Sequence, residues 1–202
     1  MWSFRRLFPA KRRLEPIIVV SGLPRSGTSM LMKMLEAGGM EIFSDGLRQS
    51  DEDNPKGYFE FERIKNLHKE KDKSWLAETR GKAVKIISDL LTELPGEHRY
   101  KIIFMHRDLD EVIASQNKML TRRGESLAQD DQKIRELFSS HLRRVGVWLR
   151  KQSNIEVVDL HYREILDDPL AQAQLMRRFL DLSLDAEKMA QAVDSTLYRN
   201  RR

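Results

Sequence analysis

A glycine-bounded turn between an apolar run and a helix-like repeat constrains the fold of this chain most. Residues 16–21 (PIIVVS) form a short β-branched run without alternation, which is typical of a strand buried on both faces of a parallel sheet. The turn GLPRSGTS follows at 22–29, and apolar residues then recur at helical spacing up to glycines 38 and 39. This order predicts an anion site, because N–H groups at a helix N-terminus point toward the ligand.

The turn has the spacing of the phosphate-binding pattern G-x-x-x-x-G-K-[ST], with one replacement. Gly22 and Gly27 keep the spacing and Ser29 keeps the hydroxyl, but Thr28 stands in place of the lysine. A kinase or ATPase would lose its main charge clamp. Arg25 restores one positive charge, and a guanidinium can donate two parallel hydrogen bonds to an anion. The plain alternative is a tight strand-to-helix connection with an exposed arginine.

The rest of the chain alternates strand-like and helix-like segments. Further strands are expected at 82–87, 100–106 and 155–160, and residues 58–73 are expected to be loosely helical after a long loop at 39–57. Asp108 and Glu111 form a capping-box pattern that opens a helix, and Asp168 with Pro169 opens another. The alternation predicts an α/β fold, with three α/β/α layers around a central parallel sheet and ligands at the carboxyl ends of the strands.

A long helix is expected over residues 129–152. Its inner face is expected to carry Ile134, Leu137, Phe138, His141, Leu142, Val145, Trp148 and Leu149.

Length and charge favour one folded unit with a basic tail. The 202 residues, 40% of them hydrophobic, predict a basic tail at 1–15 and a single domain at 16–202. The chain has 36 basic and 31 acidic residues. The excess of five equals the number of basic residues at positions 1–13, so residues 14–202 are formally neutral and no nucleic-acid partner is expected. The basic residues of the tail are Arg5, Arg6, Lys11, Arg12 and Arg13.

The expected location is the cytoplasm. The chain has no cysteine, and neither a signal peptide nor a run of about 18 apolar residues is visible. The tail interleaves aromatic and basic residues, which leaves weak contact with an anionic membrane surface as an alternative to a plain basic tail.

Three stretches resemble sulfotransferases that use 3′-phosphoadenosine 5′-phosphosulfate (PAPS). VVSGLPRSGTSMLMKMLEAGG resembles the 5′-phosphosulfate loop of that family, whose turn commonly reads PRSGTS or PRSGTT. MHRDLDEVIASQNKM resembles its pairing of a strand-end arginine, here Arg107, with a helix serine, here Ser115. HYREILDDPLAQAQLMRRFLDL is similar to the Tyr-Glu-Asp-Leu and Asp-Pro helix of many bacterial members, although Arg163 and Glu164 follow Tyr162 here.

The resemblance implies a P-loop NTPase-like fold and transfer of a sulfuryl group from PAPS to a hydroxyl or amine of a small-molecule or glycan acceptor. It implies no metal, and the spacing of the five histidines does not suggest one. Lys85 would contact the bridging oxygen of PAPS, with an ordinary edge-strand lysine as the alternative. Arg107 and Ser115 would bind the 3′-phosphate, and Arg199 and Arg201 are either a strap over the phosphates or a frayed tail. The 5′-phosphosulfate would contact Arg25, Ser26, Gly27, Thr28 and Ser29, and Arg25 is expected to be a catalytic residue together with Lys85 and Glu60.

The catalytic base is not set by the same motifs. Cytosolic members of the family often have a histidine two residues after the lysine, but Ile87 stands there in this chain. The segment NPKGYFEFE at 54–62 resembles a loop that brings a glutamate to the acceptor, and we choose Glu60 over Glu62 and Asp45. Each of these acids has a plain alternative as a solvated or helix-start residue.

Two other functions fit the same residues. One is a nucleotide-binding protein without catalysis, and the other is a divergent P-loop nucleotide kinase, which Thr28 disfavours.

Overall fold

The computed structural model describes residues 15–45, 59–125 and 130–194. Most of the expected basic tail, together with Arg199 and Arg201, lies outside these residues.

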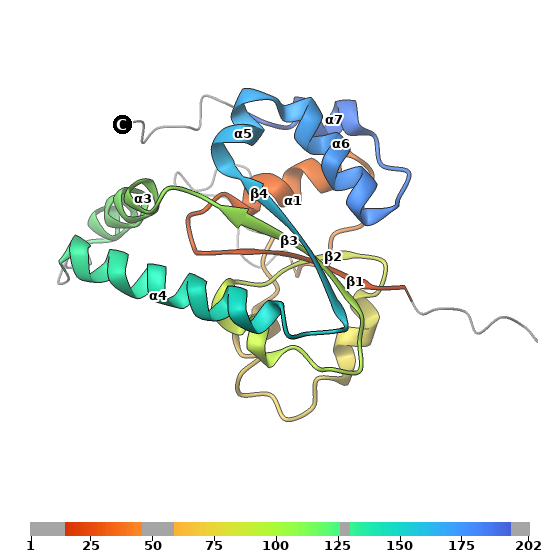
Figure 1. Cartoon of the computed structure of the whole chain (residues 1–202), viewed down its shortest axis with the longest axis horizontal. Coiled ribbons are helices and arrows are strands. Elements are labelled where there is room, and N and C mark those ends of the chain that lie inside the picture. The colour runs from red at the N-terminus through yellow and green to blue at the C-terminus, as the bar shows by residue number, and fades with distance from the viewer. Residues whose placement is uncertain (1–14, 46–58, 126–129, 195–202) are drawn as a thin grey trace, which may run out of the picture.

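Four parallel strands form the centre of the described fold (Figure 1). They are β1 (Ile17–Gly22), β2 (Ala83–Lys85), β3 (Tyr100–His106) and β4 (Ile155–His161), in the order β2-β1-β3-β4. The register pairs Val19 with Val84 of β2 and with Ile102 of β3. Every residue of β1 is buried, as its continuous apolar run predicts.

Helical layers cover both faces of the sheet, which confirms the predicted α/β/α architecture (Figure 1). One face packs against α1 (Thr28–Ala37), α5 (Tyr162–Asp167), α6 (Pro169–Leu180) and α7 (Ala186–Gln191). The other packs against α2 (Glu62–Lys65), α4 (Asp131–Leu149) and the 3₁₀ helices η1 (Ser74–Thr79) and η2 (Ser88–Glu93). Helix α3 (Leu109–Arg122) follows β3 and contacts α4.

The predicted helix starts at two aspartates are confirmed. The Asp108 side chain accepts hydrogen bonds from the backbone N–H groups of Asp110 and Glu111, and the Asp168 side chain accepts one from Ala171. The Glu111 carboxylate, which the capping-box pattern would direct to the Asp108 backbone, contacts two arginines instead.

Two sequence expectations are wrong. Within residues 59–73 only 62–65 are α-helical, because this stretch has few apolar residues to form a buried stripe. Leu137 was expected on the inner face of α4 but is 61% exposed. The residues of α4 that pack in or against the core lie in its C-terminal half, and the N-terminal part of the helix extends toward α3 (Figure 1); the core residues of α4 are Leu142, Val145, Trp148 and Leu149.

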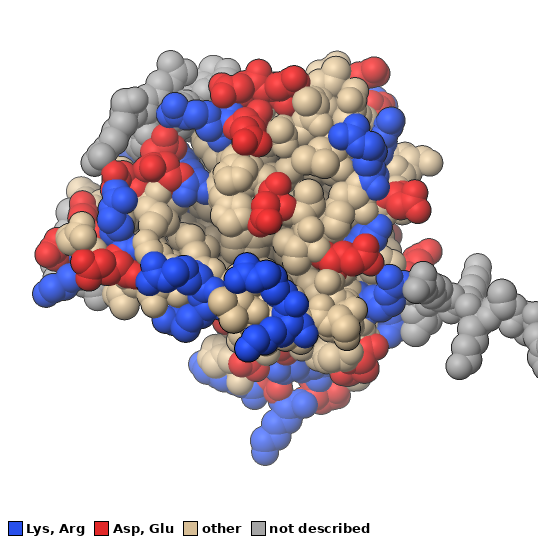
Figure 2. Space-filling view, in the orientation of Figure 1, with Lys and Arg blue, Asp and Glu red and all other residues tan. Residues whose placement is uncertain are grey.

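The surface in Figure 2 carries basic and acidic side chains interspersed among uncharged ones. Among the described residues, no helix is both long enough and apolar enough to span a membrane.

Candidate functional site

The glycine turn connects β1 to α1 at the carboxyl edge of the sheet. Gly22 and Gly27 have φ angles of 150° and 108°. A Cβ on Gly22 would lie 2.7 Å from the Met105 carbonyl oxygen, and one on Gly27 would lie 2.6 Å from the Tyr162 ring. Both positions therefore require glycine.

The start of α1 presents backbone rather than side-chain groups to a ligand. Its N-cap is Gly27, so no side chain caps the first turn. The buried Ser26 hydroxyl donates to the Leu23 carbonyl at 2.7 Å and closes the turn. Thr28, in place of the P-loop lysine, is also buried.

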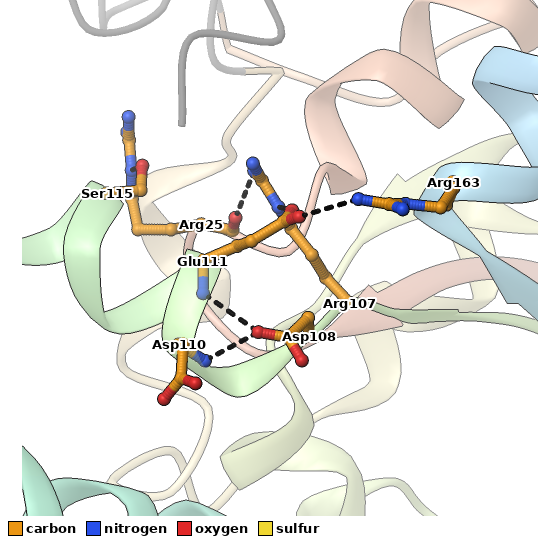
Figure 3. A network of polar contacts seen from close by, with 7 residues as sticks. All are labelled: Arg25, Arg107, Asp108, Asp110, Glu111, Ser115 and Arg163. Carbon is orange, nitrogen blue, oxygen red and sulfur yellow. Dashed lines mark hydrogen bonds and ion pairs between the residues drawn. The ribbon is translucent and has the colours of Figure 1, made fainter. Parts of the chain in front are cut away.

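Arg25, Arg107 and Ser115 lie together although they come from three elements (Figure 3). Arg25 has a left-handed backbone, with φ of 68°, and its Nε donates to the Ser115 hydroxyl at 3.2 Å. Its carbonyl accepts a hydrogen bond from Nη1 of Arg107, also at 3.2 Å. The two motifs that the resemblance links to the 5′-phosphosulfate and to the 3′-phosphate therefore meet in one cluster.

Three groups fix the Arg107 side chain. Its Nε donates to the Glu111 carboxylate at 2.9 Å, and its Nη1 donates to the Arg25 carbonyl. The guanidinium also lies over the Tyr162 ring, with its central carbon 4.1 Å from the ring centroid. Tyr162 is the first residue of α5, directly after β4, and its ring lies against Gly27 of the turn. It therefore links the turn to the arginine.

A second cluster joins the turn to the β2 edge strand. The Lys85 ammonium donates to the Ser29 hydroxyl at 3.3 Å and lies 3.6 Å from a Glu60 carboxylate oxygen. The Lys85 side chain is only 9% exposed, so it is not an ordinary solvated edge lysine. The other oxygen of Glu60 lies 3.1 Å from Lys65.

The three acids considered as bases have different surroundings. Glu60 contacts Lys85, whereas the exposed Glu62 pairs with Lys65 at 2.7 Å. Asp45 accepts the backbone N–H of Glu62 at 2.5 Å and so stabilises the start of α2. Hydrogen bonds to Glu62 and then Glu60 raise the pKa of Lys65, against the opposing effect of partial burial. Lys65 therefore stays positively charged beside both glutamates at neutral pH.

Three residues of the site were missed or given no role by the sequence reasoning. Glu111 was interpreted only as a helix cap, and Tyr162 and Arg163 were noted only as part of a family-like stretch. The available signal was spacing, because Glu111 lies one helical turn after Arg107 and Arg163 follows a strand end. In the described part of the chain, no group of three or more histidines and acids is arranged to bind a metal.

Comparison with solved structures shows the same fold. Sulfotransferase STF1 from Mycobacterium tuberculosis matches with a TM-score of 0.59 and 19% identity, covering 89% of this chain and 70% of that one. Mouse sulfotransferase SULT7A1 complexed with PAP matches with a TM-score of 0.53 and 17% identity, over 90% and 63%. The sulfotransferase domain from the curacin biosynthetic pathway matches with a TM-score of 0.52 and 15% identity, over 93% and 87%.

The family comparison covers more than half of the chain. A search of curated protein sequences found no match. The model described as "Sulfotransferase family" matches residues 56–186, a range that contains Glu60, Lys85, Arg107 and Ser115 and starts after the glycine turn. With the fold and the arrangement of these side chains, the match shows that the chain belongs to the sulfotransferase family.

Proposed function

We propose that this protein transfers the sulfuryl group of PAPS to a hydroxyl or amine of a small-molecule or glycan acceptor. The observation that carries the proposal is the pair of clusters on one glycine turn. Arg25 contacts Ser115 and Arg107, and Ser29 accepts a hydrogen bond from Lys85, which in turn lies beside Glu60. One anionic nucleotide bound along the turn would contact both clusters.

The first cluster and the turn would bind the nucleotide. Arg25, Thr28, Ser29 and the N–H groups of the turn would contact the 5′-phosphosulfate, and Arg107 with Ser115 would contact the 3′-phosphate. The mouse protein of similar fold was solved in complex with PAP, which supports a donor of this type. Arg199 and Arg201 remain proposed additional contacts, and no step depends on a metal.

The second cluster would carry the chemistry. The acceptor oxygen or nitrogen attacks sulfur, its proton passes to the Glu60 carboxylate, and the bond from sulfur to the bridging oxygen breaks to release PAP. Lys85 would stabilise the negative charge that develops on the bridging oxygen. Its contact with Ser29 supports this role, because it directs the ammonium toward the turn.

Nucleotide-dependent stabilisation tests the donor. We expect PAPS or PAP to raise the Tm of the full chain, whereas ATP with Mg²⁺ leaves it unchanged. The Arg25→Ala variant should need a higher PAP concentration for the same shift. Equal stabilisation by ATP, lost on chelation, would instead support the nucleotide kinase alternative.

Transfer of labelled sulfur from PAPS to a panel of phenols, alcohols and amines tests the chemistry. We expect Lys85→Met and Glu60→Gln to lower kcat by about 10²-fold or more while PAP still binds. Glu62→Gln is the matched control, since Glu62 pairs with Lys65, as Glu60 does, but is exposed. Normal PAP binding without sulfated product from any acceptor would favour the non-catalytic alternative. Full activity of Glu60→Gln would remove Glu60 as the base.

A further inference from the structure

Glu111 is a buried acid in a cluster that otherwise suits an anion. Its side chain is only 7% exposed, and it lies on α3 beside the residues proposed to bind the 3′-phosphate (Figure 3). Burial of a charge is costly without paired partners, and a carboxylate next to a phosphate site also repels the ligand. The interactions that the Glu111 carboxylate makes must offset both costs.

Helix capping does not account for Glu111. The N-terminus of α3 already has the Asp108 side chain, which accepts the backbone N–H groups of Asp110 and Glu111. Asp110, the other acid in the first turn, forms an ion pair with Arg135 of α4. The Glu111 carboxylate instead lies between Arg107, at 2.9 Å, and Arg163, at 3.5 Å.

The two arginines are held to different degrees. Arg107 is 8% exposed and contacts Glu111, the Arg25 carbonyl and the Tyr162 ring. Arg163 is 66% exposed and contacts Glu111 at the longer distance. The carboxylate therefore acts mainly on Arg107, whose guanidinium it orients by a charge-assisted hydrogen bond.

We propose that Glu111 is the positioning residue that fixes Arg107, and that it thereby sets the preference for a nucleotide with a 3′-phosphate over one without it. This proposal rests on the proposed function, because it takes Arg107 as a ligand of that phosphate. Glu111 acts through Arg107 and does not touch the nucleotide.

The test compares the affinities of PAP and AMP, which differ only in the 3′-phosphate, by titration calorimetry of the full chain. In Glu111→Ala we expect the preference for PAP over AMP to fall by about tenfold or more, with the Kd of AMP unchanged. Glu111→Gln should keep the preference to within about threefold, because its amide oxygen can still accept from Nε of Arg107.

Two further variants separate positioning from general damage to the fold. Asp110→Ala is the matched control, since it removes the neighbouring ion-paired acid of the same helical turn and should leave the preference unchanged. In an Arg107→Ala background, removal of Glu111 should have no additional effect on the preference, because its effect passes through Arg107. If Glu111→Ala does not fold, Glu111→Asp replaces it, since it keeps the charge but withdraws the carboxylate from Arg107.

The outcomes distinguish this inference from the proposed function. A wild-type protein that binds PAP and AMP equally would remove the 3′-phosphate site and the inference together. If the wild type prefers PAP and Glu111→Ala, or Glu111→Asp in its place, keeps that preference, only the role of Glu111 is overturned. An equal loss in Glu111→Gln and Glu111→Ala would also overturn it, because charge rather than position would then decide the effect.

Discussion

At the scale of single residues, Gly27 is limited by its backbone and by its neighbour at once. Its φ of 108° is unfavourable for residues with a Cβ, and that atom would lie 2.6 Å from the Tyr162 ring. Tyr162 cannot shift freely, because Arg107 stacks on it. A substitution at Gly27 should therefore lower the stability and also displace the Arg107 guanidinium.

We predict that Gly27→Ala lowers the free energy of unfolding by about 2 kcal/mol or more, from backbone strain and overpacking together. Urea unfolding measures the loss, and calorimetry should show weaker PAP binding. Gly39→Ala isolates the strain, since its φ is 95° with nothing within 4 Å of the added Cβ, and Gly96→Ala meets neither problem. Equal losses in Gly27→Ala and Gly39→Ala would show that contact with Tyr162 has no importance.

His98 gives a pH-dependent prediction. Burial, and then the charge of Arg80, lower the pKa of His98 below its ordinary value of 6.5. The unfolded chain therefore binds a proton at His98 more tightly than the folded chain does, and below about pH 6.5 unfolding takes up this proton. The stability that the neutral, buried His98 provides at higher pH is therefore lost as the pH falls from about 6.5 toward the lower pKa of the folded state. Urea unfolding between pH 8 and 5 should show a smaller acid-side loss in His98→Gln than in the wild type.

The control is His68→Gln, because His68 is exposed. The acid-side loss of unfolding free energy in His68→Gln should equal that of the wild type. An acid-side loss in His98→Gln as steep as in the wild type would assign that loss to other groups.

At the scale of elements, a lysine of the sheet stabilises the end of a helix. The Lys101 ammonium of β3 donates to the carbonyl oxygens of Phe179 and Leu180, at 2.7 and 3.1 Å. These carbonyls end α6, where intrahelical donors run out. Lys101 therefore joins the central sheet to the layer that includes α6.

We predict that Lys101→Met destabilises the protein by about 1–2 kcal/mol, because two carbonyls lose a charged donor. The Tm should fall by about 2–8 °C. Lys188→Met is the control, since Lys188 forms an exposed ion pair with Asp185 and should change the Tm little. No difference between the two variants would mean that solvent satisfies the end of α6 equally well.

Elements with strong periodicity could be predicted from the sequence, and weakly patterned ones could not. The strands predicted at 100–106 and 155–160 from their apolar runs are β3 and β4, and α6 follows from Asp168 and Pro169. The short α5 carries no distinct stripe of its own. Leu137 shows a different limit, because helical periodicity identifies an apolar face but not where the neighbouring layer ends.

The candidate site shows the same division. The grouping of Arg25 with Arg107 and Ser115 follows from their places at strand ends and in the next helix. The pairing of Glu111 with Arg107 could not be predicted from the sequence, because an acid in the first turn of a helix is equally typical of helix capping. The contact between Tyr162 and Gly27 depends on how α5 leaves β4, which no local pattern specifies.

At the scale of the whole molecule, stability should be highest in the middle of the sheet. β1 and β3 each pair with two strands, whereas β2 and β4 lie at the edges. We predict that amide hydrogens of peptides covering 17–22 and 100–106 exchange most slowly, and that those of 83–85 and 155–161 exchange faster. Hydrogen exchange followed by mass spectrometry checks the order. Exchange of 155–161 as slow as that of 17–22 would require another element to protect β4.

The position of β1 has a consequence for synthesis on the ribosome. β1 is made before the other described strands. α1 follows it directly and covers one of its faces, but its two partner strands come about 65 and 80 residues later. The nascent chain therefore carries a strand with two unpaired edges and one uncovered face until the segments from η1 to β3 have emerged. Such a segment is prone to aggregation during translation, so recovery of folded protein should depend on chaperones that shield β1 until β3 has been made.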